Sequence, residues 1–159
     1  MIRPLLIRSA PDNPPFPVDA LALEEDTGLV LSADPTVRDP GESLSRTLSE
    51  LQEQRLYKPG SVVVRDGSPR RFLAVVHDFD REPSWCEDWI SMALERVFTL
   101  ADEHGAQALA LERVGCVHGQ LQPTRFDALL NGALAARSSD LPERIWLIES
   151  RRWTDEPTR

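Results

Sequence analysis

Cysteine and histidine are scarce in this chain of 159 residues. It contains two cysteines, Cys86 and Cys116, and three scattered histidines, with no CxxC or HxxxH spacing. Two isolated cysteines do not make a disulfide framework or a zinc site. We therefore expect a reduced protein with no structural metal and no cofactor.

Acidic residues outnumber basic ones, 26 to 18, and long apolar runs are absent from the sequence. The formal net charge is −8, and affinity for a phosphate backbone depends on clustered positive charge, so nonspecific nucleic-acid binding is not expected. No apolar run approaches the ~20 residues that span a bilayer, and the apolar segment near the amino terminus is too short for a secretory signal. These absences predict a cytoplasmic protein that does not enter membranes.

The remaining composition is that of a globular domain. Hydrophobic residues make up 41% of the chain and charged residues 28%. We expect one domain over residues 1–150 and a polar tail over 151–159. Apolar runs alternate with helical spacings, which predicts a mixed, mostly parallel α/β sheet covered on both faces. The predicted strands are 5–9, 18–23, 61–65, 71–77, 108–114 and 144–149, and the predicted helices are 43–55, 85–104 (capped by Ser84) and 123–137.

A glycine loop follows the apolar run at 108–111. The loop holds Gly115 and Gly119, and the last predicted helix begins soon after it, near Pro123. A buried strand that ends in such a loop before a helix leaves backbone N–H groups free to face an anion. The pattern predicts a nucleotide or phosphate site at the carboxyl end of a parallel sheet. The alternative is that both glycines only provide positive φ in a tight turn.

Residues 11–26, PDNPPFPVDALALEED, resemble the opening of a macro domain, in which a GDIT-like turn precedes the pattern VDAIVNAAN. Asp12 falls where that family has its adenine-contacting aspartate; otherwise it is a turn aspartate. Residues 60–63 and 75–77 resemble the next two strands of the family. The resemblance to macro domains, which bind ADP-ribose, covers residues 5–149. It implies a three-layer α/β/α fold.

The sequence departs from the family pattern at both phosphate loops. Leu23 and Asp26 stand where NAAN has its asparagines, and no glycine-rich first loop follows in 28–41. Residues 115–121 stand for the second loop, with Val117 where a glycine is expected. De-ADP-ribosylating members carry their activity on that asparagine and the first loop, so the resemblance gives only weak support for a hydrolase.

Several side chains near these loops have two interpretations. Cys116 is either a reactive thiol at a helix amino terminus or a small half-buried residue. His118 is either a ligand contact or an exposed loop residue without a role. His77 ends an apolar strand, which favours a histidine at the edge of the core, bonded to backbone. The acidic run 24–26 favours a solvated rim over a divalent-cation site.

These patterns lead to three functional hypotheses. The first is a noncatalytic binder of ADP-ribose or a related nucleotide, with its pocket between residues 26–41 and 114–121. The second is a degenerate macro fold that serves as a protein–protein or homo-oligomerisation module. The third is a hydrolase of an ADP-ribosyl or phosphoester bond, with Asp26 or His118 as base. The predicted ligand-binding residues are Asp12, Asp26, Gly115, Cys116, Val117, His118 and Gly119.

Overall fold

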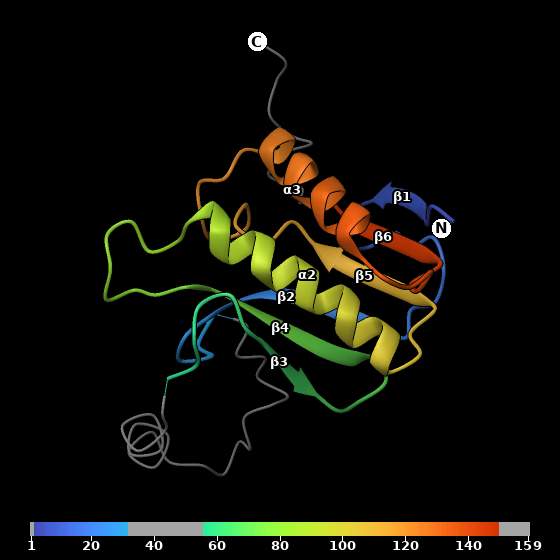
Figure 1. Ribbon diagram of the computed structural model, residues 1–159, viewed down its shortest axis with the longest axis horizontal. Coiled ribbons are helices and arrows are strands. Elements are labelled where there is room, and N and C mark those ends of the chain that lie inside the picture. The colour runs from blue at the N-terminus through green and yellow to red at the C-terminus, as the bar shows by residue number, and fades with distance from the viewer. Residues whose placement is uncertain (1, 32–55, 150–159) are drawn as a thin grey trace.

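The computed structural model describes residues 2–31 and 56–149, and these residues form one six-stranded sheet with two helices (Figure 1). The strand order across the sheet is β1-β6-β5-β2-β4-β3. The strands are β1 (Leu5–Ser9), β2 (Ala20–Asp26), β3 (Val62–Arg65), β4 (Arg70–His77), β5 (Ala108–Glu112) and β6 (Arg144–Ile148). The helices are α2 (Glu87–Glu103) and α3 (Pro123–Ala136).

The sheet is mixed and mostly parallel, as predicted. β1 pairs with β6, β6 with β5, β5 with β2 and β2 with β4, all in parallel, and only the β3–β4 pair is antiparallel among the described strands. Asp19, just before β2, accepts hydrogen bonds from the N–H groups of Gln107 and Ala108 at 2.9 and 3.0 Å. This carboxylate fixes the start of β5 beside the start of β2, so the two strands end at the same edge.

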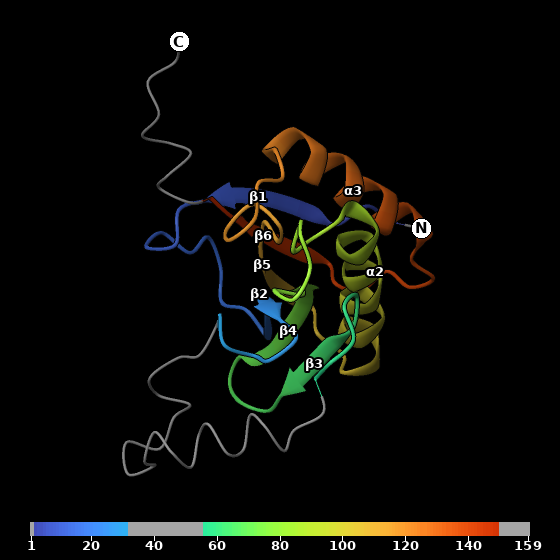
Figure 2. The ribbon, with the colours of Figure 1, turned by 90° about the vertical axis from the view of Figure 1, so that its left-hand side faces the viewer.

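Helices α2 and α3 lie on the same face of the sheet (Figure 2). Their apolar residues, among them Leu94, Phe98 and Leu130, pack with strand residues such as Phe72 and Leu109 in one buried cluster. Alternate strand residues point to the opposite face of the sheet, and that face is apolar as well. It carries Leu73, Val75, Ala110 and Trp146, all buried. The helix predicted at 43–55 lies outside the described residues, as does the tail at 151–159.

Two element boundaries differ from the prediction in ways that shape the site. β2 continues to Asp26, three residues beyond its predicted end at 23, because Glu24 and Glu25 stay paired with β4. α2 begins at Glu87 with Cys86 as its N-cap, and no side chain caps it. Ser84 therefore does not cap the helix, contrary to the prediction. No helix in the described part of the chain is long and apolar enough to cross a membrane.

Candidate functional site

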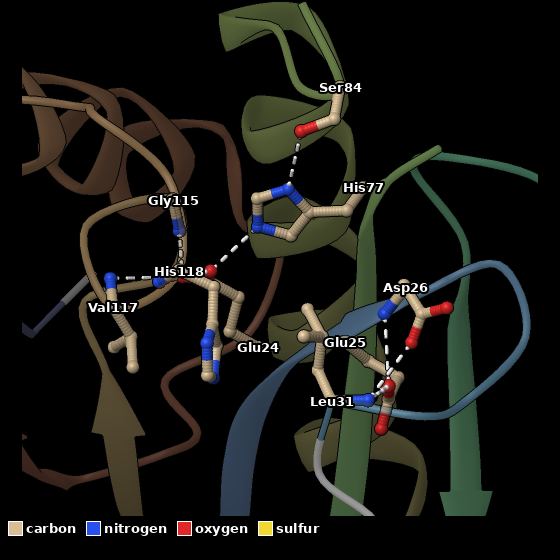
Figure 3. Close-up of polar contacts among 9 residues, drawn as sticks. All are labelled: Glu24, Glu25, Asp26, Leu31, His77, Ser84, Gly115, Val117 and His118. Atoms are coloured by element: carbon tan, nitrogen blue, oxygen red, sulfur yellow. Dashed lines mark hydrogen bonds and ion pairs between the residues drawn. The ribbon is translucent and has the colours of Figure 1, made fainter. Parts of the chain in front are cut away.

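The carboxyl ends of β2, β4 and β5 meet at one edge of the sheet, because these three neighbouring strands are parallel (Figure 3). β2 contributes the acidic run 24–26, β4 contributes His77, and β5 leads into the loop at 113–121. The predicted anion site belongs to this edge. Its geometry differs from the prediction in one decisive respect.

The backbone amides of the glycine loop are not free, because the carboxylate of Glu24 accepts their hydrogen bonds. Oε1 accepts the N–H groups of Gly115 and Val117, the latter at 3.2 Å, and Oε2 accepts the N–H of His118 at 2.7 Å. Oε2 also lies 2.6 Å from Nε2 of His77. Glu24 is 1% exposed. We call this arrangement the Glu24 cap: one carboxylate fills the amide cluster that the sequence predicted for an external anion.

His77 is completely buried and contacts two side chains rather than backbone with its ring. Since a carboxylate only accepts hydrogen bonds, Nε2 of His77 carries a hydrogen and donates it in a hydrogen bond to Glu24. Nδ1 lies 3.3 Å from Oγ of Ser84. The ring of Phe79 stacks on the imidazole, with 5.5 Å between the two ring centroids. The prediction of a histidine bonded to backbone is therefore wrong. The strand end points its ring at Glu24 instead.

A second set of backbone amides, on the turn that follows β2, also donates hydrogen bonds to carboxylates of the chain. Oδ1 of Asp26 accepts the N–H groups of Val30 at 2.6 Å and Leu31 at 3.0 Å, and Oδ2 accepts that of Gly28 at 3.1 Å. Oε1 of Glu25 accepts from Leu31 as well, at 2.9 Å. The acidic run is buried, so the predicted solvated rim is wrong. The physical reason is that backbone donors satisfy these carboxylates and remove the need for water.

The local electrostatics follow from these bonds. Burial raises the pKa of Asp26, but hydrogen bonds from Glu25 and from the amides of Leu31, Val30 and Gly28 outweigh it, so the net pKa lies below its usual value. Glu112, at the end of β5, behaves in the opposite way. Burial raises its pKa to about 7, an N–H from Glu24 lowers it in part, and the charge of Glu24 raises it.

Neither a protein-family model nor the sequence of a curated protein matches this chain. Solved structures do match it. The macrodomain of Thermus aquaticus DarG is 16% identical with a TM-score of 0.64, and the match covers 93% of this chain and 100% of that one. The macro domain of ganglioside induced differentiation associated protein 2 is 10% identical (TM-score 0.62), with 92% and 77% of the two chains covered. A mutant of the Oceanobacillus iheyensis macrodomain with ADPR is 9% identical (TM-score 0.60), with 84% and 79% covered.

The chain has the macrodomain fold. Identities this low establish the fold alone. The resemblance seen in the sequence is thereby confirmed, and so is the predicted α/β class with its mostly parallel sheet.

Within this macrodomain fold, the predicted site residues are only partly brought together. Asp26 and the loop at 115–119 lie at neighbouring strand ends. Asp12 lies exposed in the turn after β1, and β6 and β5 separate that strand from β2. Of the predicted pocket wall at 26–41, residues 32–41 lie outside the described residues.

The loop residues themselves have structural roles in this fold. Gly115 has φ +89°, which an L side chain rarely adopts, and Gly119 packs so closely on the Gly115 carbonyl that a Cβ would overlap it. Cys116 is 1% exposed, and burial raises the pKa of its thiol to about 12. The reactive-thiol interpretation is therefore wrong, because a buried thiol does not ionise near neutral pH. The side chain of His118 is exposed, and its backbone N–H belongs to the Glu24 cap.

Sequence reasoning missed Glu24 and Ser84. A signal for Glu24 was present: where the macro-domain pattern VDAIVNAAN has two alanines, this chain has Glu24 and Glu25. A carboxylate in place of a methyl group, one strand away from a glycine loop, is long enough to reach that loop. No local pattern pointed to Ser84, whose partner His77 lies on a different element.

Proposed function

We propose that this chain is a macrodomain-fold module that acts through protein contacts and does not hold a nucleotide by its glycine loop. The Glu24 cap carries the proposal. Three loop amides that could bind a phosphate already donate to a carboxylate that belongs to the chain. An incoming phosphate gains no new donor from these amides unless Glu24 leaves.

Displacing Glu24 is unfavourable for two reasons. Its carboxylate is completely buried, and a buried carboxylate that loses its partners costs several kcal/mol. The edge is also acidic, since Glu25 and Asp26 follow Glu24 at the end of β2. Like charges at short range repel an entering diphosphate. Both effects oppose the binding of an anion and leave neutral surfaces unaffected.

Exposed apolar side chains on this edge support a protein partner. Val30 is 48% exposed, Leu56 is 58% and Phe79 is 57%. They lie on three segments joined side by side, because Thr27 donates its N–H to the His77 carbonyl and accepts one from Tyr57. Exposed apolar side chains on adjoining segments are typical of contact surfaces between proteins.

The second candidate is the noncatalytic binding of ADP-ribose or a related nucleotide. The observation in its favour is the fold, which this chain shares with a macrodomain solved with ADPR. This function requires Glu24 to swing out of the loop when the ligand enters. It also requires Asp12 to contact the adenine, as the resemblance implies.

Calorimetry with ADP-ribose separates the two candidates. We expect no binding heat for the wild-type chain at ligand concentrations up to about 1 mM, the weak end of the usual affinity range. Glu24→Ala restores the alanine of the family pattern and frees the amides, so we expect it to bind ADP-ribose or inorganic phosphate at least about tenfold more tightly than wild type. Glu143→Ala, which removes an exposed carboxylate at the opposite edge, is the charge-matched control. Binding by the wild type would establish the second candidate instead.

The protein-contact part of the proposal has its own measurement. The simplest partner is a second copy of the chain, and sedimentation velocity over a range of concentrations detects it. Phe79→Ser should weaken any association, whereas Met92→Ser removes an equally exposed apolar side chain from α2 and should not. A chain that stays monomeric excludes the homodimer and leaves only a different protein as the partner.

A further inference from the structure

Ser84, His77 and Glu24 form a continuous hydrogen-bonded line at the carboxyl edge (Figure 3). Oγ of Ser84 lies 3.3 Å from Nδ1 of His77, and Nε2 of the same ring lies 2.6 Å from Oε2 of Glu24. The three residues come from the loop before α2, the end of β4 and the end of β2. A hydroxyl, an imidazole and a carboxylate in this order have the connectivity of a serine hydrolase triad.

We propose that Ser84 is a nucleophile that cleaves small uncharged carboxylic esters, with His77 as its general base and Glu24 as the residue that positions His77. This activity goes beyond the proposed protein-contact function, although both involve Glu24.

The proton positions required for this role follow from the cap. The carboxylate oxygens of Glu24 accept hydrogen bonds from the N–H groups of Gly115, Val117 and His118. Glu24 also accepts a hydrogen bond from the Nε2–H of His77, which leaves the lone pair of Nδ1 to accept a hydrogen bond from the Ser84 hydroxyl. The loop N–H groups thus hold the Glu24 carboxylate in place, and this carboxylate in turn fixes the tautomer of His77.

The position of Ser84 is fixed independently of the histidine. The N–H of Asp78 donates to the Ser84 carbonyl at 2.7 Å, which closes the loop between β4 and α2. Ser84 is half-buried, whereas His77 is completely buried. Helix α2 begins three residues later, and its N-cap residue Cys86 makes no side-chain bond to the first turn. N–H groups at the start of a helix are suited to stabilise an oxyanion beside the nucleophile.

The surroundings of Ser84 define the class of substrate. The loop carries three acids, Asp78, Asp80 and Glu82, against one base, Arg81, which pairs with Asp78 at 3.5 Å. Its net negative charge disfavours an anionic ester. Phe79 is exposed and stacks on His77, and the half-buried Trp85 follows Ser84 directly. These aromatic rings favour a short apolar acyl group.

The reaction balances with water as the only co-reactant. Oγ of Ser84 attacks the ester carbonyl carbon while its proton passes to Nδ1 of His77, and the tetrahedral intermediate expels the alkoxide, which takes that proton and leaves as an alcohol. Water then attacks the acyl-serine carbonyl, again giving a proton to Nδ1. Collapse of the second intermediate releases the carboxylic acid and returns the proton to Oγ.

The test uses p-nitrophenyl butyrate and a fluorophosphonate probe on the full chain. We expect a burst of about one p-nitrophenolate per chain and a covalent phosphonate on Ser84, located by peptide mass spectrometry. Ser84→Ala should lower the rate by about 100-fold or more, because general-base catalysis contributes 10²–10⁴-fold. Ser91→Ala, a half-buried serine on α2, should retain the wild-type rate.

Three results would overturn the proposal: no burst above the buffer rate, a label on a residue other than Ser84, or a Ser84→Ala rate within about twofold of wild type. The labelling uses the wild-type chain, so it does not depend on how the variant folds. For the positioning role of Glu24, Glu24→Gln should lower kcat at least tenfold while KM stays within about twofold. If Glu24→Gln lowered the activity only by unfolding part of the protein, the burst amplitude would fall while kcat per active chain stayed unchanged. None of these results bears on ADP-ribose binding, so the two proposals fail separately.

Discussion

Nε2 of His77 and Oε2 of Glu24 are 2.6 Å apart, and both side chains have no solvent exposure. The two residues are 53 positions apart in the chain, on strands that pair in parallel. Removing one member of a buried polar pair destabilises a protein more than replacing both members by apolar groups, because the remaining member stays buried without a hydrogen-bond partner. Glu24 has four partners, so the stability of the whole edge depends on it.

Glu24→Gln should therefore destabilise the protein by about 3 kcal/mol, because the amide nitrogen of glutamine cannot accept the bonds that a carboxylate oxygen accepts. For a chain of this length the melting temperature should fall by roughly 6–12 °C. Differential scanning calorimetry measures the change. Glu143→Gln, on the exposed opposite edge, should stay within about 0.5 kcal/mol of wild type. Equal stability of the two variants would contradict the Glu24 cap.

Asp26 should make the protein acid-sensitive. Its pKa is lower in the folded state than the ordinary 3.8, so the folded state holds fewer protons and the stabilisation is present above pH 3.8. It is lost as the pH falls below 3.8 through the folded pKa. Urea unfolding between about pH 3 and 6 should show this loss in wild type and a flatter profile in Asp26→Asn. If the free energy of unfolding of Asp26→Asn fell more steeply with acid than that of wild type, the downward shift of the Asp26 pKa would be contradicted.

Glu112 should have the opposite effect near neutrality. Burial raises its pKa from 4.5 to about 7, so between these values the folded state keeps a proton that the unfolded chain has lost. Stability should fall as the pH rises from 4.5 to 7 and then level off, by on the order of 3 kcal/mol. Glu112→Gln should remove this slope in urea unfolding measured across the same range, while Glu143→Gln should preserve it.

The close approach within the glycine loop predicts different outcomes at two glycines. A Cβ on Gly119 would overlap the Gly115 carbonyl oxygen and lie 3.3 Å from Cδ1 of Trp85, so Gly119→Ala should cost about 1–3 kcal/mol. A Cβ on Gly132, within α3, meets nothing within 4 Å. Gly132→Ala should therefore stabilise the protein by about 0.5–1 kcal/mol, because alanine favours a helix interior. Chemical denaturation of both variants checks the pair.

Cys116 should resist thiol reagents in the native protein. It is 1% exposed and its thiol pKa is raised to about 12, so almost no thiolate is present at pH 8. With Cys86→Ser to remove the half-buried cysteine, reaction with a chromogenic disulfide should require unfolding and should follow the urea curve. Rapid labelling under native conditions would show that the loop opens.

Much of the secondary structure was predictable because its signals are local. Apolar runs and helical spacing identified β1 from Leu5 to Ser9 without error and placed β4, α3 and β6 to within one residue at each end. The order of the macro-domain motifs then indicated the fold class and the mixed, mostly parallel sheet. The end of β2 was not predictable, since acids are rare inside strands and Glu24–Asp26 looked like a loop.

The amino-acid sequence by itself determined most of the extended and helical segments that the structure describes, and that a glycine loop follows β5. Only the tertiary structure decided what fills that loop. Glu24 is 91 residues from Gly115, and Ser84 is linked to Glu24 through His77. Periodicity and composition report on neighbours in sequence, whereas the partner of a buried charge depends on which strands the folded sheet places side by side. That physical difference turned a predicted site for an external anion into a site occupied by the chain's own carboxylate.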